Sequence, residues 1–199
     1  MITDAVLPIV DAMSLSEMHR ALLQPGALVV GRDGESHRLP RYFYQVDSWA
    51  LALATPVTSH FGLWEFMDVD LREPLPLRTF PRYIPCAVTL IAAALEAVRL
   101  DLGMPMRVAA NGGYRSPSHA KSDVGSLHCW GAAANIYSIG PDLLDTQERI
   151  ERVMGVVRRV LPFAWLRPYG AELGMADDHV HIDIGYATLV PRGASEHKG

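Results

Sequence analysis

The sequence predicts an α+β fold in which a small antiparallel sheet packs against a few helices. Two segments, 86–102 and 145–160, have the apolar spacing and the end signals of helices. Short runs of branched and aromatic residues beside turn-forming segments predict strands before, between and after them. The elements come in mixed order, without the regular strand–helix alternation of a parallel sheet. We therefore expect antiparallel pairing.

The composition is that of an ordinary globular protein. The 199 residues are 49% hydrophobic and 20% charged, which is incompatible with a largely disordered chain. We predict a single domain over 1–199, with an N-terminal extension of helix and hairpin at 1–60 and a core at 61–192. The net charge of −4 and the lack of Lys/Arg runs argue against nucleic acid as a partner.

The most apolar stretch, 84–100, contains Pro85 and Glu96, so we expect a core helix there and no transmembrane segment. The first residues lack the basic region and the cleavage site of a secretory signal. The sequence therefore predicts a cytoplasmic protein as encoded. Cys86 and Cys129 are far apart in the sequence, and no disulfide is predicted.

Local signals place the individual elements. Ser14 and Glu17 form a capping box that predicts a helix up to residue 23, and a hairpin is expected over 27–31 and 38–46. Five prolines rule out a long regular element over 55–85, which we expect to wrap the outside of the core. Its anchors would be Phe61, Trp64 and Phe66. Gly103 would end the first long helix, Asp145 would cap the second, and Pro162 would stop it. Further strands are predicted at 106–110, 163–167 and 179–186.

The segment 179–184, HVHIDI, alternates polar and aliphatic residues. In a strand, His179, His181 and Asp183 share one face and the aliphatic residues share the other. Imidazoles and carboxylates are ligand types that suit zinc. A solvent-facing polar edge is the alternative, but two histidines opposite an all-aliphatic face favour a metal site.

A second segment, 126–136, reads SLHCWGAAANI. Its small residues allow close backbone packing, so that His128 and the Asn135 amide can converge on one metal across a turn. If this segment is considered by itself, the preferred interpretation of His128 is a structural histidine beside a buried Trp130. Its pairing with His181 is what favours the functional interpretation.

Together these segments resemble the zinc D-Ala-D-Ala carboxypeptidases, which have the Hedgehog-type peptidase fold. GYRSP at 113–117, S-x-H-x-x-G-x-A-x-[D] at 126–135 and V-H-[IV]-D at 180–183 occur in the order and spacing of that family. The resemblance covers 61–192, counting a weaker segment at 61–66. It implies a zinc metallopeptidase, acting as a carboxypeptidase or an endopeptidase on cell-wall peptides or peptidoglycan fragments.

The resemblance implies that His128, Asn135 and His181 are the metal ligands, with Asn135 where the family has an aspartate. An amide oxygen is neutral, so zinc would be held weakly or not at all, while the pKa of a bound water would fall further. Three neighbouring groups are candidates to compensate for the lost charge: Asp178, Asp183 and the Cys129 thiol.

The resemblance also implies the catalytic groups. The family's general base precedes the last histidine by a few positions, which gives Asp178, with Asp177 as a substitute. A turn or bulge is needed there, because strand alternation would point Asp178 away from His181. His179 would stabilise the tetrahedral intermediate or steady the base.

The substrate groups are also implied by the resemblance. Arg115 would bind the substrate carboxylate or the developing oxyanion, and Tyr114 and Ser126 are its substrate-binding neighbours. The remaining histidines are predicted to be ordinary surface residues: His19, His37, His60, His119 and His197.

The sequence therefore predicts a metal-dependent hydrolase that cleaves a peptide bond with metal-activated water. The alternative is a pseudo-enzyme or binding module that keeps the groove but lacks tight zinc because of Asn135. A third interpretation makes the histidines purely structural. A cytoplasmic dipeptidase, a phage-type lysin and an effector delivered by a secretion machine are each compatible with the missing signal. The oligomeric state is not predicted.

Overall fold

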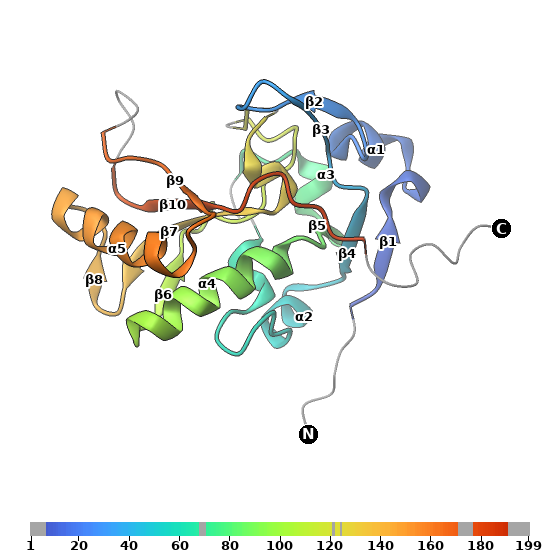
Figure 1. The fold of residues 1–199 in the computed structure, drawn as a ribbon. Coiled ribbons are helices and arrows are strands. Elements are labelled where there is room, and N and C mark those ends of the chain that lie inside the picture. Colours follow the sequence, from blue (N-terminus) through green and yellow to red (C-terminus); the bar gives the residue numbers. More distant parts are fainter. Residues whose placement is uncertain (1–6, 68–70, 121, 124, 171–176, 191–199) are drawn as a thin grey trace.

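The segments that carry the histidine motifs lie side by side in one antiparallel sheet (Figure 1). The computed structural model describes residues 7–67, 71–120, 122–123, 125–170 and 177–190. In this sheet the strand order is β6-β7-β10-β9, and β8 pairs with β7. The strands are β6 (Met106–Val108), β7 (Ala133–Ile139), β8 (Asp142–Leu143), β9 (Trp165–Leu166) and β10 (Val180–Asp183).

Two helices, α4 (Val88–Leu102) and α5 (Gln147–Val160), lie on one side of the β7 and β10 strands (Figure 1). Their buried residues recur at helical spacing, as an amphipathic helix requires. On α4 these are Val88, Ile91, Ala92, Leu95 and Val98, and on α5 they are Ile150, Val153, Met154 and Val157. All of them belong to one hydrophobic core.

Strand alternation gives this sheet one apolar face and one polar face. Ala134 and Ile136 of β7 pair with Ile182 and Val180 of β10, and all four are completely buried in the core. The residues between them in the two strands therefore point to the opposite face. That second face carries the site residues.

The N-terminal part forms two smaller antiparallel sheets with short helices. One has the strand order β1-β4-β5, and the other pairs β2 with β3. The strands are β1 (Ile9–Asp11), β2 (Leu28–Val30), β3 (Ser36–Arg38), β4 (Tyr42–Val46) and β5 (Arg82–Pro85). The α-helices are α1 (Glu17–Leu23), α2 (Trp49–Ala54) and α3 (Leu75–Arg78), and the 3-10 helices are η1 (Ala12–Ser14), η2 (Leu63–Phe66) and η3 (Leu127–Trp130).

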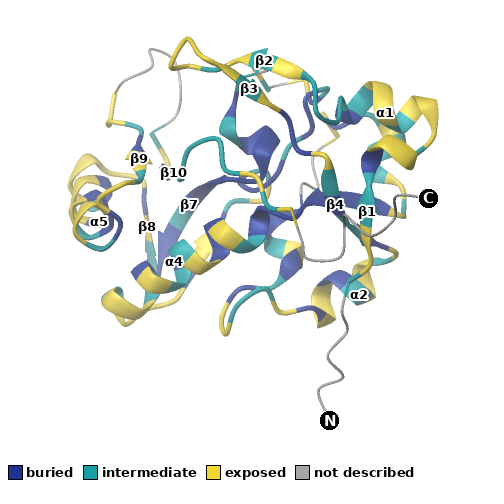
Figure 2. Cartoon of the chain, turned by 45° about the vertical axis from the view of Figure 1, so that its right-hand side comes forward, coloured by how far each residue is buried: buried dark blue, intermediate teal, exposed yellow. Residues whose placement is uncertain are grey.

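Buried residues run along β7 and η3, while the outward sides of α1, α4 and α5 are exposed (Figure 2). The α+β prediction with small antiparallel sheets is therefore confirmed. Within the described ranges, no helix has the length and apolar character needed to cross a membrane.

Both long helices are confirmed. Gly103 adopts a left-handed conformation with φ of 64° and ends α4 as predicted. The cap of α5 is Thr146, whose side chain accepts from the N–H of Arg149, and not Asp145. The first helix is likewise capped by Ser16 and not by Ser14, because Ser14 already belongs to η1.

The predicted hairpin over 27–46 is only partly correct. Strands β2 and β3 form it, but β4 belongs to another sheet, where it pairs with β1 and β5. Among its described residues, 55–67 and 71–85, the segment 55–85 holds no helix longer than one turn. Its end is the fully buried strand β5 and not an outer wrapping. Phe61 and Phe66 anchor the segment in the core as predicted, whereas the prediction for Trp64 is wrong, because Trp64 is 46% exposed.

Candidate metal centre

Asn135 and His181 face each other across the sheet. They are direct partners in the antiparallel pairing of β7 and β10, and Oδ1 of Asn135 lies 2.9 Å from Nδ1 of His181. Asn135 is 6% exposed, and the His181 side chain is 12% exposed. The predicted turn between His128 and Asn135 lies at the left-handed Gly131, which ends η3, and β7 begins two residues later at Ala133.

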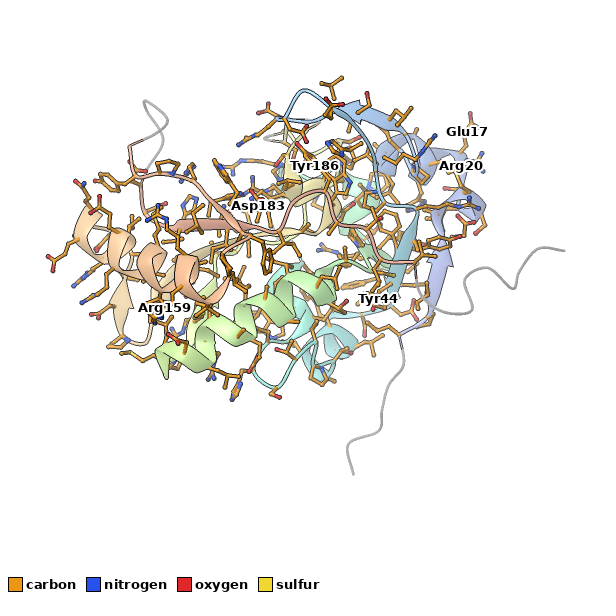
Figure 3. The ribbon with its side chains drawn as sticks, in the orientation of Figure 1. Glu17, Arg20, Tyr44, Arg159, Asp183 and Tyr186 are labelled. Atoms are coloured by element: carbon orange, nitrogen blue, oxygen red, sulfur yellow. The ribbon has the colours of Figure 1, made fainter. Side chains whose placement is uncertain are left out.

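Asp183 anchors the His181 ring from its other nitrogen. Its Oδ2 lies 3.2 Å from Nε2 of His181, and its Oδ1 accepts from the N–H of Gly185 at 3.2 Å. Asp183 lies on β10 (Figure 3) and is buried. It comes two residues after His181 in the strand, so the two side chains share the polar face as the sequence predicted. Both ring nitrogens of His181 therefore face an oxygen atom.

His128 lies on η3 and is 3% exposed. Its Nδ1 is 2.7 Å from the carbonyl oxygen of Gly113, which can only accept, so Nδ1 carries the proton and Nε2 keeps its lone pair. Burial lowers the pKa of His128 well below its usual range, and the positive charge of Arg115 adds to this effect. The ring is thus neutral at pH 7, with its centroid 5.1 Å from that of His181.

The Asn111-Gly112-Gly113 loop holds His128 and Asn135 in place through its backbone. A Cβ on Gly113 would lie 2.5 Å from Cα of Phe66, and one on Gly112 would lie 2.8 Å from the Asn135 carbonyl oxygen. Gly112 O also accepts from the Asn135 N–H at 2.8 Å. These glycines are needed for the close approach of other backbone atoms and not for an unusual backbone conformation, since neither has a positive φ.

Arg115 lies beside the histidines. Its backbone N–H donates to the His128 carbonyl at 3.2 Å, and its Nε donates to the Asn111 carbonyl at 2.7 Å. Tyr114 is 5% exposed and packs edge-on against Phe43, so its ring belongs to the core in this structure. Ser126, the N-cap residue that precedes η3, is 8% exposed.

Asp178 and His179 form a contact just before β10. Nδ1 of His179 lies 2.7 Å from Oδ1 of Asp178. Burial lowers the pKa of His179, and Arg167 adds to this effect against the opposing influence of Asp178. Because β10 begins only at Val180, strand alternation does not fix where Asp178 points. Asp177, the substitute base, accepts from the N–H of Gly170 at 3.1 Å.

Two residues near the site had no signal in the sequence. Trp165 on β9 is 46% exposed and lies edge-on to His181, with ring centroids 5.6 Å apart. Arg167 follows it, and its Nη2 lies 3.0 Å from Nε2 of His179. Both are brought to the site by the pairing of β9 with β10, and no local sequence pattern predicts that pairing.

The other predicted groups are placed elsewhere. Cys129 is a free thiol in a small apolar cluster with Leu39, Trp130 and Ala132, and burial raises its pKa to about 12. The prediction that His119 is a surface residue is wrong, because it is 3% exposed. His197 lies outside the described residues.

The candidate ligand atoms suit a divalent cation such as zinc, but one of them, the amide oxygen of Asn135, is a weak ligand. Among the described residues, no three His, Cys, Asp or Glu side chains are placed to hold a metal ion. The candidate ligands are instead the imidazoles of His128 and His181 together with the amide oxygen of Asn135. Zinc accepts such nitrogen and oxygen ligands, although a neutral amide holds it less strongly than a carboxylate does.

Comparisons with known proteins give no relative. The chain has no significant match to a protein-family model, to a curated protein or to a solved structure.

Proposed function

We propose that the protein is a metal-dependent hydrolase of the D-Ala-D-Ala carboxypeptidase type, with a Hedgehog-type peptidase fold. Its substrates would be peptidoglycan-derived or related peptides. The observation that carries the proposal is the anchoring of both imidazoles: the Gly113 carbonyl binds one nitrogen of His128, and Asp183 faces one nitrogen of His181. Outer partners of this kind orient histidines at protein metal sites and raise their basicity.

The chain's own groups would act as follows. His128, Asn135 and His181 would hold the cation, which supplies polarisation of the scissile carbonyl and a lowered pKa of water. Asp178 would accept the proton of the attacking water and pass it to the leaving amine. His179 would steady that carboxylate, since it contacts Asp178 directly.

Arg115 supplies the positive charge for substrate binding. Its positive charge contributes to the lowered pKa of His128, so that charge acts at this imidazole. A guanidinium at this position would bind a terminal carboxylate or stabilise a developing oxyanion. The first of these roles fits peptides that end in a free carboxyl group, which a carboxypeptidase cleaves.

Metal binding and turnover test the proposal together. Protein purified without chelators is analysed for metal, stripped, and titrated with zinc by calorimetry while its melting temperature is followed. Cleavage is measured on a peptide ending in D-Ala-D-Ala, with the L-Ala-L-Ala peptide as control. His181→Gln should abolish binding and turnover, and the control variant His19→Gln should not. If the protein holds no metal and zinc neither binds nor raises the melting temperature, the hydrolase proposal is wrong.

A second candidate function is a binding module that has lost catalysis, and Asn135 itself favours it. When the amide is turned over, its NH2 group donates to Nδ1 of His181 while Asp183 accepts from Nε2, so the ring is satisfied without metal. An aspartate cannot do this in its ionised form. Turnover gained by Asn135→Asp, where the parent chain shows none, would favour this candidate.

A further inference from the structure

Arg167 joins the site through both its backbone and its side chain. Its N–H donates to the carbonyl of His181 at 3.4 Å, which continues the pairing of β9 with β10 by one residue. Residues opposite each other in such a pair point to the same face of the sheet. Arg167 therefore stands on the polar face beside His181, on the side away from Asn135, since β10 lies between β7 and β9.

The chemistry of the guanidinium fixes the direction of two hydrogen bonds. Arginine has only N–H donors and stays protonated in proteins, so at the 3.0 Å contact Nε2 of His179 must be the acceptor. A neutral imidazole that accepts at Nε2 carries its proton at Nδ1. That proton points to Oδ1 of Asp178 at 2.7 Å. Arg167 therefore donates to His179, and His179 in turn donates to Asp178.

We propose that Arg167 is a positioning residue that fixes His179 in the Nδ1–H tautomer and, through it, orients the carboxylate of Asp178. The second part rests on the proposed function, in which Asp178 is the general base. With Arg167 on one nitrogen and Asp178 on the other, His179 has no N–H left to stabilise an oxyanion. Of the two roles predicted for His179, the structure favours steadying the base.

The orientation matters because, among the described residues, His179 is the side chain that contacts the Asp178 carboxylate. Its side chain is 67% exposed, whereas that of His179 is 18% exposed. An exposed carboxylate samples several rotamers, and a base works only when it lies within hydrogen-bonding distance of the proton that it removes. A fixed imidazole N–H restricts this freedom. Loss of Arg167 leaves Nε2 without its charged donor and releases the ring.

Nitrogen NMR of the histidine rings tests the tautomer in the full chain, whether or not it is an enzyme. In the parent protein, Nδ1 of His179 should show the shift of a protonated nitrogen and Nε2 that of an unprotonated one. Arg167→Met should give averaged shifts for both nitrogens, Arg167→Lys should restore the parent pattern, and the exposed control Arg158→Met should leave it unchanged. A protonated Nε2 in the parent, or an unchanged pattern in Arg167→Met, overturns the proposal.

Kinetics test the second part. In metal-loaded protein, Arg167→Met should lower kcat by about 10- to 100-fold with little change in KM, less than the ~10²–10⁴-fold that a general base contributes. Arg167→Lys should recover part of the loss. An unchanged kcat overturns the positioning role. If neither the parent nor any variant cleaves peptide, the proposed function fails, while the NMR result still decides the tautomer. Circular dichroism of each variant verifies folding. The NMR spectrum of the parent protein by itself can refute the proposed Nδ1–H tautomer of His179.

Discussion

Oδ1 of Asn135 lies 2.9 Å from Nδ1 of His181, between residues that are directly opposite in the pairing of β7 with β10. Two backbones in register hold these side chains together, so their contact does not depend on a flexible loop. In the proposed function, a cation held here would meet the neutral amide oxygen of Asn135 and not a charged carboxylate oxygen. Under this proposal, the affinity for metal would depend on this pair.

Asn135→Asp should tighten zinc binding by at least about tenfold, or ~1.4 kcal/mol, because a carboxylate adds a charged ligand without changing the size of the side chain. The same variant should be less stable than the parent in chelator, since the new carboxylate is buried and cannot donate to His181. Calorimetry and thermal unfolding measure the two effects. Equal zinc affinity in both proteins would mean that residue 135 is not a ligand.

Asp183→Asn should weaken metal binding by about 10- to 100-fold, the usual effect of losing a charged partner of a histidine ligand. The amide keeps the shape of the carboxylate and its contact with the N–H of Gly185, so the effect reports mainly the lost charge beside His181. Zinc titration measures it. Asp47→Asn, at an exposed position, is the matched control and should bind zinc like the parent.

The parts of the fold that the sequence predicts well are those with local causes. Helix α4 has good helix formers and a glycine at its end, and the alternation HVHIDI places His181 and Asp183 on one face of β10 without any partner strand. The two histidines of the site were predicted in this way, His181 from its strand and His128 from the motif pattern. Their convergence, with ring centroids 5.1 Å apart, is what the structure adds.

The parts that could not be predicted depend on distant pairing. Strand β7 begins in a run of glycine and alanine, which have low strand propensity, and it is a strand because β6 and β10 pair with it on both sides. Its contact with His181 spans 46 residues. Arg167 and Trp165 come to the site through the register of β9, and no local pattern carries that information.

Gly113→Ala should destabilise the protein by about 1–3 kcal/mol, because its Cβ would lie 2.5–2.7 Å from the backbone of Phe66 and the neighbours must shift. The shift should also displace the carbonyl that binds His128 and weaken zinc binding. Gly155→Ala is the matched control. Gly155 is exposed in the middle of α5, and nothing lies within 4 Å of a Cβ built there. This change should therefore stabilise the protein by about 0.5–1 kcal/mol. Urea unfolding measures the change in unfolding free energy for both variants. Changes of the same sign in the two variants would contradict the prediction.

The two thiols should be inert in the folded protein. Cys86 and Cys129 are each 1% exposed, and burial raises the pKa of both to about 12. At pH 8 the reactive thiolate is then roughly a thousandfold rarer than in an ordinary cysteine. A disulfide reagent such as DTNB should label neither cysteine quickly in native protein and both in urea. Rapid labelling of one thiol in native protein would contradict its burial.

The same thiols should make stability fall at alkaline pH. Their pKa is raised in the folded state above the ordinary value of 9.0, so the unfolded chain loses these protons first. The stabilisation is complete below pH 9 and is lost as pH rises toward 12. At pH 9.5 the pair should account for about 1–2 kcal/mol of the loss in unfolding free energy. The double variant Cys86→Ala/Cys129→Ala should show a shallower decline between pH 7 and 9.5 in urea unfolding, whatever its absolute stability. An equal slope in both proteins would show that the thiols ionise alike in the folded and unfolded states.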